Sequence, residues 1–295
     1  MKLLSYTLVS FSCLLSSLAS AENVNQDPMN RDPGAQQRLN TTRGMPEGPN
    51  VRVLLCADQK SLEIVVPGGH NIYNPKNGKK LEVSFLHSEY SMKPSQNGVK
   101  WGEEFPGVFQ VMVVPDSPNT HVLVNGITYP GVVICYQVGD RLAAVNHVSL
   151  DDFSASVLCN SLLPSLNDTK ESIAAFAIAL RSKGFEYAQH PKNTFWDIQA
   201  ASCSFRGNGV LRQDRPYLDG MKVTQRLVLV GKEIGMLSAK NESVASLLAS
   251  MPQGEVTKMA QNGKNAKEIL EQFFPDAIMT TAPTSSEGTQ KYLNS

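Results

Sequence analysis

The sequence predicts an α+β protein, with a β-rich N-terminal half followed by a helix-containing core and C-terminal helices. The first observation is a series of short β-branched and aliphatic runs between turn residues, from about 50 to 150. The second is a change to helical spacing of apolar residues in the part from about 151 to 279. The third is the content of 41% hydrophobic residues in a chain of 295, which is enough to form a core.

The apolar runs of the N-terminal half are separated by turn residues. Asn125-Gly126 is typical of a tight hairpin turn, because both residues tolerate a positive φ. The expected strands are 51–55, 62–66, 81–86, 108–114, 121–124, 132–137 and 142–148.

The longest helix is expected to begin at Asp168. Asp168 and Glu171 have the three-residue spacing of a capping box, and Gly184 is expected to end the helix. Its buried face combines apolar residues at i, i+3, i+4 and i+7, namely Ile173, Phe176, Ala177 and Leu180.

Three shorter elements are expected nearer the C-terminus. The first is a strand at 223–230, and two helices follow at 252–262 and 265–274. Asn265 and Glu268 repeat the capping spacing at the start of the second helix.

The first 21 residues have the features of a secretory signal peptide. Lys2 provides a positive charge, 3–18 is uncharged and largely apolar, and 19–21 (Ala-Ser-Ala) has the small-x-small form that precedes cleavage. We therefore expect cleavage near Ala21 and export to the periplasm or cell envelope. Cys13 raises the alternative of a lipoprotein, but Ser10 occupies a position where a lipidation signal prefers leucine.

Both flanks of the predicted domain are polar. The segment 22–49 is rich in Pro, Gly, Asn and Gln, which predicts a disordered leader, and 280–295 is expected to be a flexible tail. The folded domain is therefore expected at 50–279.

Charge and cysteine content limit the partners and cofactors. Lysine plus arginine and aspartate plus glutamate both number 27, so the chain lacks the basic surplus of a nucleic-acid-binding protein. The five histidines show no ligand spacing, and we expect no metal or other cofactor. Four cysteines remain after signal cleavage, and both disulfides and free thiols stay open for them: Cys56, Cys135, Cys159 and Cys203.

An ordered series of segments resembles the stage II sporulation protein D (SpoIID) and amidase-enhancer (LytB) family. That family has a V-N-G-x-x-Y-x-G turn, a V-N-x-V-x-L-E-x-Y-L segment, an E-A-L-K-A-Q-A-V-A-A-R-T helix and C-terminal M-S-Q, M-A-x-x-G and E-I-L-x-x-Y-Y-P motifs. The similar segments here are 50–55, 66–69, 124–131, 145–153, 170–182, 222–229, 251–253, 258–263 and 267–275. The resemblance thus extends from Asn50 to Pro275.

The resemblance implies a peptidoglycan-directed protein, with glycan strands as ligand and a cell-wall amidase as a possible partner. The sporulation member is a lytic transglycosylase, which cleaves between N-acetylmuramic acid and N-acetylglucosamine and forms a 1,6-anhydro ring without water. One carboxylic acid with a raised pKa can protonate the leaving oxygen and then accept the proton of the sugar hydroxyl.

The sequence differs from the family at the residues of this chemistry. Anchored on Pro164, the V-x-x-E-M-P motif places Leu162 at the position of the catalytic glutamate, and leucine cannot transfer a proton. The segment 246–253 corresponds to the family's glycine-rich segment but lacks its histidine and its glycines. The segment 202–207 is all that corresponds to the cysteine motif that binds zinc in some members. The resemblance implies a substrate groove formed by Ser161, Leu162, Pro164, Arg181, Cys203, Arg206, Met251 and Gln253.

Three hypotheses follow. The favoured one is a glycan-binding or cell-wall-remodelling protein that lacks the catalytic acid. The alternative is an active lytic transglycosylase whose acid has moved to Asp168, Glu171 or Asp197. The third is an unrelated exported β-rich binding module.

Overall fold

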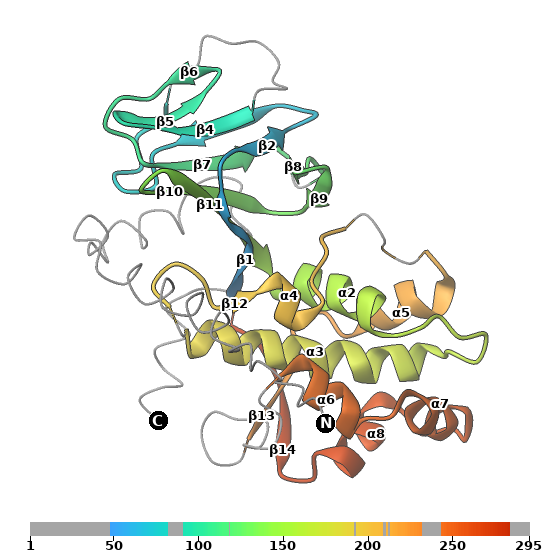
Figure 1. The fold of residues 1–295 in the computed structure, drawn as a ribbon. Coiled ribbons are helices and arrows are strands. Elements are labelled where there is room, and N and C mark those ends of the chain that lie inside the picture. The colour runs from blue at the N-terminus through green and yellow to red at the C-terminus, as the bar shows by residue number, and fades with distance from the viewer. Residues whose placement is uncertain are drawn as a thin grey trace, which may run out of the picture. The chain divides into compact units, whose positions relative to one another are not determined.

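The computed structural model describes residues 48–81, 91–117, 119–191, 193–208, 211, 213–231 and 243–283, all within the compact unit Asp32–Ser295. It confirms the α+β class, because strands dominate up to residue 149 and helices dominate afterwards (Figure 1).

The first sheet has six strands in the order β12-β1-β11-β10-β7-β3. All neighbours are antiparallel except β12, which is parallel to β1. Alternation of β-branched residues places one row of side chains, including Val51 and Val53, in the main core. The strands are β1 (Asn50–Gln59), β3 (His70–Tyr73), β7 (Gln110–Pro115), β10 (Val132–Val138), β11 (Arg141–Ser149) and β12 (Ile198–Gln199).

The second sheet has six strands in the order β6-β5-β4-β2-β8-β9. Its β8–β9 hairpin confirms the predicted turn, since Asn125 and Gly126 have φ values of 49° and 77°. The Asn125 side chain also accepts a hydrogen bond from the Glu63 amide at 3.0 Å, which joins this turn to β2. The strands are β2 (Leu62–Val65), β4 (Ser91–Ser95), β5 (Gly98–Trp101), β6 (Glu103–Glu104), β8 (Val122–Val124) and β9 (Ile127–Tyr129).

The strand predictions for this half are confirmed except at 81–86. Leu81 lies outside any strand, and 82–86 lies outside the described residues. The sequence analysis missed β3, β4, β5, β6 and β9, which are two to five residues long and mix polar with apolar residues.

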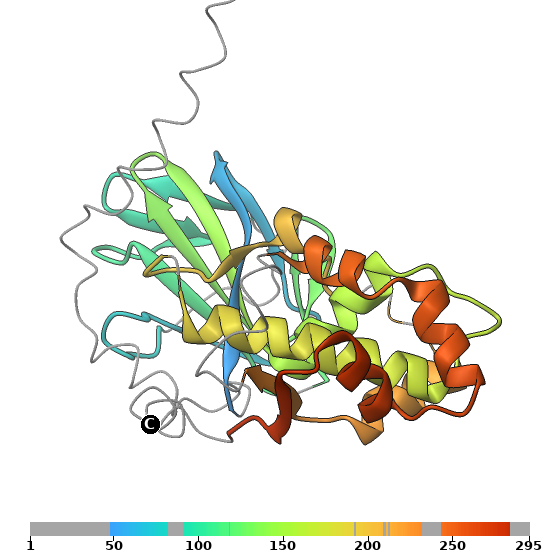
Figure 2. The same cartoon turned by 90° about the horizontal axis from the view of Figure 1, so that it is seen from below.

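Helices and one hairpin form the rest of the described chain. The helices are α2 (Leu150–Ser161), α3 (Lys170–Gln189), α4 (Ala200–Cys203), α5 (Arg215–Val223), α6 (Val244–Ser250), α7 (Gln253–Gln261) and α8 (Ala266–Phe273). The hairpin consists of β13 (Leu227–Gly231) and β14 (Ala277–Thr281). Helix α3 contacts α2, α5, α7, α8, β1 and β13, and Figures 1 and 2 show it in the middle of the helical part.

The long helix α3 is present, but both of its predicted ends are wrong. Thr169 is the N-cap, and its capping box is formed with Ser172, one residue later than predicted. The helix passes through Gly184 to Gln189. A Cβ atom at Gly184 would lie 2.8 Å from Phe153 Cδ1, so this glycine allows α2 to approach α3 closely.

The two C-terminal helices are confirmed, including the capping box between Asn265 and Glu268. The predicted strand at 223–230 is shorter, because Val223 ends α5 and β13 begins at Leu227. Helices α2, α4, α5 and α6 and strands β12 and β14 were missed. The predicted tail begins inside β14, which extends to Thr281.

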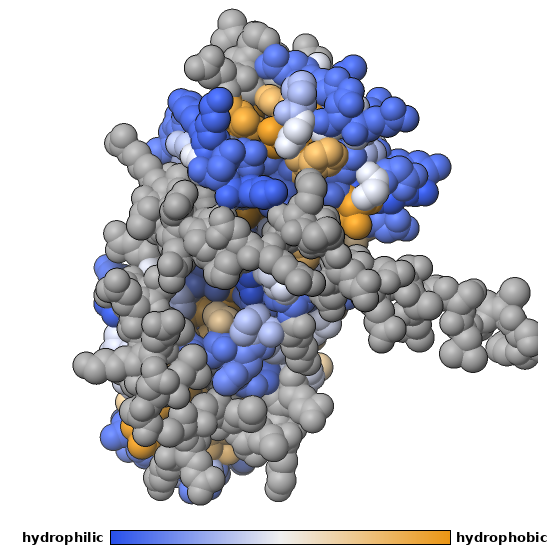
Figure 3. All heavy atoms as spheres, turned by 90° about the vertical axis from the view of Figure 1, so that its left-hand side faces the viewer, coloured by the Kyte–Doolittle hydropathy of each residue, from blue (hydrophilic) through white to orange (hydrophobic). Residues whose placement is uncertain are grey.

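The face shown in Figure 3 is mainly hydrophilic where the described residues are visible, with smaller hydrophobic areas between them. Within the described ranges, no helix combines the length and the apolar composition that a membrane crossing requires.

Candidate functional site

Several of the predicted site residues lie on helix α2, at its ends or in contact with it. Ser149 is both the last residue of β11 and the N-cap of α2. Its hydroxyl accepts a hydrogen bond from the Asp152 amide at 3.0 Å and donates one to Asp152 Oδ2 at 2.7 Å. The helix ends at Ser161, and the amide of its C-cap, Leu162, donates to the Leu158 carbonyl at 3.0 Å.

The position assigned to the missing acid lies at the C-terminal end of α2. The Leu162 side chain is 9% exposed and belongs to the main core. The neighbouring Leu163 is 80% exposed, and Pro164 and Leu166 are also exposed. The Ser161 hydroxyl is buried and has no hydrogen-bond partner among the described residues. Leucine at 162 therefore contributes to packing in this structure.

The start of α7 contacts this end of α2. Gln253 Nε2 donates a hydrogen bond to the Leu163 carbonyl at 2.7 Å, across a sequence separation of 90 residues. The structure therefore brings together Gln253 and the 161–164 segment, which the sequence analysis assigned to one groove.

The loop after α4 contacts the middle of α2. Ser156 Oγ donates to the Gly207 carbonyl at 2.7 Å and accepts from the Arg206 amide at 3.2 Å. Gly207 has a φ of 68°, and a Cβ atom there would lie 2.0 Å from the Thr128 carbonyl oxygen. The loop is thus held tightly between α2 and β9, with the Arg206 side chain exposed.

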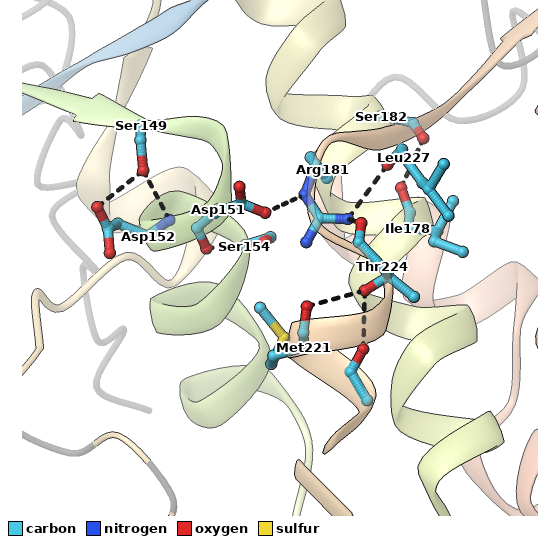
Figure 4. Close-up of polar contacts among 11 residues, drawn as sticks. Ser149, Asp151, Asp152, Ser154, Ile178, Arg181, Ser182, Met221, Thr224 and Leu227 are labelled. Atoms are coloured by element: carbon cyan, nitrogen blue, oxygen red, sulfur yellow. Dashed lines mark hydrogen bonds and ion pairs between the residues drawn. The ribbon is translucent and has the colours of Figure 1, made fainter. Parts of the chain in front are cut away.

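Arg181 is not on the surface, in contrast to its predicted place in the groove. Its side chain is 0% exposed, and its Nε donates to Asp151 Oδ1 at 2.6 Å. Nη1 donates to the carbonyls of Thr224 at 2.7 Å and Leu227 at 3.1 Å (Figure 4). Burial lowers the pKa of Arg181, and Asp151 opposes that shift. Arg181 therefore joins α2, α3 and the α5–β13 turn.

Cys203 and Met251 are also buried, so neither can contact a ligand from solvent in this structure. Burial raises the pKa of Cys203 to about 12, which disfavours the thiolate that zinc requires. Among the described residues, no group of three or more His, Cys, Asp or Glu side chains is arranged to hold a metal ion.

Asp168 and Glu171, two of the alternative acids, each accept a hydrogen bond from a backbone amide. Asp168 Oδ2 accepts a hydrogen bond from the Ser165 amide at 3.1 Å. Glu171 Oε2 accepts one from the amide of Ala266, the first residue of α8, at 2.9 Å. A carboxylate at a helix N-terminus is favoured by the unpaired amide groups there.

Asp197, the third alternative acid, is buried and paired with Arg52. Arg52 donates to Asp197 Oδ1 from Nη2 at 2.6 Å and from Nε at 3.0 Å. The Arg52 amide donates to Oδ2 at 2.7 Å. Burial raises the pKa of Asp197, while Arg52 lowers it. Both oxygens therefore hold the segment before β12 against β1.

The same segment covers part of the sheet surface opposite the main core. Trp196 packs against the cluster of Leu54, Ala143 and Val145, and Phe195 meets Tyr136 edge to face at 5.1 Å. The sequence analysis missed this arrangement because no local pattern connects 195–197 to β1.

Cys56, Cys135 and Cys203 are free thiols in the structure. Cys56 of β1 and Cys135 of β10 both lie opposite Ala144 of β11, one on each side of that strand. The two cysteines are therefore two strands apart. Two strand spacings are about 10 Å, which exceeds the Cα separation of a disulfide. A Cys56–Cys135 bridge is therefore incompatible with this sheet.

Asp152, in the first turn of α2, is not among the candidate acids of the sequence analysis. Burial raises the pKa of Asp152, while Ser149 and His121 lower it and Asp151 adds to the rise. His121, just before β8, lies near Asp152, and its Nε2 lies 3.4 Å from Asn208 Nδ2 in the loop after α4. Only the tertiary fold shows that these three residues are close.

The fold and these contacts define an α+β protein in which segments from both halves converge on one helix, α2. The chain is similar to an uncharacterized protein of Chlamydia muridarum (strain MoPn / Nigg), with 29% identity over 231 residues, 78% of this chain and 76% of that protein. It is also similar to an uncharacterized protein of Chlamydia pneumoniae, with 27% identity over 231 residues, 77% of this chain and 80% of that protein. No protein-family model matches the sequence, and no solved structure matches it significantly.

Proposed function

We propose that this chain is an exported protein that binds peptidoglycan glycan strands in the periplasm or cell envelope, as a diverged member of the stage II sporulation protein D and amidase-enhancer family. The single observation that carries the proposal is the hydrogen bond from Gln253 Nε2 to the Leu163 carbonyl. It joins the 251–253 segment, which is similar to the family, to the stretch that corresponds to the V-x-x-E-M-P motif, although the two are 90 residues apart in the sequence.

The residues around this hydrogen bond are better suited to binding a ligand than to transferring a proton. Leu162 supplies no acid, whereas Leu163 and Leu166 are exposed and can pack against the apolar parts of a glycan. A cell-wall amidase is the partner that the family resemblance suggests. The signal peptide predicted at 1–21 would bring the chain to the same compartment as the ligand.

Co-sedimentation with purified sacculi tests the proposal. Mature protein, residues 22–295, should be recovered with the insoluble fraction at moderate salt. Gln253→Ala should weaken this recovery, because the loop after α2 loses its support. Gln261→Ala is the matched control, since Gln261 is an exposed residue of the same helix. Complete recovery of the folded wild type in the supernatant contradicts the proposal.

Leu162→Glu tests the assignment of the acid position. The new carboxyl group would replace a side chain in the apolar core, where desolvation raises the pKa of a carboxyl group. If the assignment is right, a folded variant should gain slow release of anhydro-muropeptides from sacculi. A folded variant that binds sacculi but releases none would contradict it.

A further inference from the structure

The hairpin of β13 and β14 is the smallest sheet of the described chain, and its two outer edges differ. The strands pair antiparallel without a bulge, from Leu227 opposite Thr281 to Gly231 opposite Ala277. In such a pair the N–H and C=O groups of successive residues point alternately to the neighbouring strand and away from it. A hairpin by itself is only marginally stable in water, so the groups that point away decide what the sheet can add.

The outer edge of β13 is closed by the rest of the fold. The Leu227 amide donates to the Thr224 carbonyl at 3.0 Å, and the Leu227 carbonyl accepts from Arg181 Nη1 at 3.1 Å. The Leu229 amide donates to Ser182 Oγ at 2.7 Å. Leu227 and Leu229 therefore point their backbone groups away from β14, toward α3 and the turn before β13.

The outer edge of β14 is open. Met279 and Thr281 lie opposite Leu229 and Leu227, so their N–H and C=O groups also point out of the hairpin. Ala277 has the same orientation, and its amide donates to the Phe274 carbonyl at 3.1 Å. No described group forms a hydrogen bond with the outward backbone groups of Met279 and Thr281.

Strand β14 also lacks the features that protect an edge strand from pairing. Its sequence, Ala277–Thr281, contains no charged residue, proline or glycine, and Ile278 is 51% exposed. Natural edge strands are usually protected by lysine, proline, a bulge or a covering segment. The edge strand β9 is an example, because its Thr128 carbonyl accepts from the Asn208 amide at 2.9 Å. Strand β14 is therefore suited to pairing with a strand of another chain.

We propose that β14 pairs antiparallel with β14 of a second copy of this chain, which gives one continuous sheet in the order β13-β14-β14-β13. The two Met279 residues lie opposite each other and exchange N–H to C=O hydrogen bonds. The Thr281 N–H donates to the Ala277 carbonyl of the other copy. Ile278 lies opposite Thr280 of the other copy, which covers part of its exposed side chain. The inference does not depend on the binding of peptidoglycan.

A second copy fits this edge for reasons of hydrogen bonding and charge. The register about Met279 supplies an acceptor for both outward N–H groups, those of Met279 and Thr281. It places no like charges opposite each other, because the strand is uncharged. The formal net charge of the chain is zero, so two copies do not repel each other strongly. A contact between identical edges across a two-fold axis closes after two copies.

The length of the edge indicates how strong the dimer is. A strand of five residues gives a small interface, and small interfaces are typical of transient complexes. The dimer should therefore be reversible and dependent on concentration. Helix α3 contacts both α2 and β13, and Figure 1 shows α2 and β14 on opposite sides of it. Pairing through β14 thus leaves the loop after α2 uncovered in both copies.

Analytical ultracentrifugation of mature protein, residues 22–295, measures the association. The average mass should rise from that of a monomer toward that of a dimer as concentration increases. Ile278→Lys should raise the dissociation constant by roughly tenfold or more, because two lysines would become diagonal neighbours across the two-fold axis. Thr281→Pro should also weaken the dimer, since it removes an outward N–H that β13 does not use. The matched control is Ile127→Lys, at a 44% exposed position of the β8–β9 hairpin, which should leave association unchanged.

A cysteine variant tests the register. Opposite residues of a hydrogen-bonded antiparallel pair have Cα atoms about 5.5 Å apart, which is within the range of a disulfide. Mild oxidation should therefore link Met279→Cys into a covalent dimer and should leave Ile127→Cys largely unlinked. Equal linking of the two variants would contradict the proposed register and overturn the inference.

Circular dichroism establishes that each variant is folded before its mass is interpreted. A wild type that stays monomeric at every concentration overturns the inference. A dimer that persists unchanged in folded Ile278→Lys and Thr281→Pro also overturns it, because another surface would then be responsible. Co-sedimentation with sacculi is measured separately. A monomer that binds sacculi refutes only this inference, and a dimer that does not bind them refutes only the proposed function.

Discussion

Replacing Arg181 by methionine should destabilise the protein by about 3 kcal/mol, because two buried carbonyls lose their donor. Nη1 of Arg181 donates to the carbonyls of Thr224 and Leu227, and each would cost about 1–3 kcal/mol if left unsatisfied. Asp151 adds little, since its side chain is 37% exposed and can return to water. Nη2 of Arg181 is buried without a partner among the described residues, and removing it offsets part of the loss.

Urea unfolding followed by circular dichroism measures this change, with the free energy obtained by linear extrapolation. Arg215→Met is the matched control, because the Arg215 side chain is 91% exposed and its contact with Asp219 is a surface ion pair. The control should change stability by less than about 0.5 kcal/mol. If Arg181→Met is no more destabilising than Arg215→Met, the bonds of Arg181 do not hold the three segments together and the reasoning is wrong.

The remaining predictions concern a glycine, a hydroxyl and a histidine. Gly184→Ala should cost about 1–3 kcal/mol in urea unfolding, because the new Cβ would meet Phe153, whereas Gly254→Ala, in open space, should be nearly neutral. Ser156→Ala removes two hydrogen bonds to the loop after α4 and should cost about 1–3 kcal/mol; unchanged amide exchange in that loop would contradict this. Burial lowers the pKa of His147 to about 3 from 6.5, so the unfolded chain binds an extra proton between these values. Stability should therefore fall as pH decreases from 6.5, by up to about 1.4 kcal/mol per pH unit, and a His147→Gln variant with the same pH dependence would refute this.

The capping motifs show which parts of the fold the sequence can predict. The capping box of Asn265 and Glu268 is a local signal and is confirmed. At α3 two candidate pairs with the same spacing overlap, and tertiary contacts decide between them. Asp168 bonds to the Ser165 amide, and Glu171 bonds across to α8. Thr169 is therefore the residue that caps α3.

Helix α2 and its surroundings were harder to predict. Most of α2 is buried, including the small polar residues Ser154 and Ser156, so its sequence shows no clear apolar stripe. Arg181 was assigned to a groove by resemblance, but its two carbonyl acceptors, on Thr224 and Leu227, are more than 40 residues away in the sequence. The proximity of His121 to Asp152 likewise depends on the meeting of β8 and α2. These contacts depend on the tertiary fold, and no local pattern encodes them.

The pairing of Arg52 with Asp197 also affects how the chain folds during synthesis. The two residues are 145 positions apart, so at 5–20 residues per second β1 is made roughly 7 to 29 s before its carboxylate partner. Throughout that time, a strand rich in valine and leucine has one edge without β12 and an arginine without its counter-ion. If a ribosome stalled before residue 197, the unpaired N–H and C=O groups of this edge could pair with other nascent chains. The protein should therefore depend on a holding chaperone more strongly than its modest size suggests.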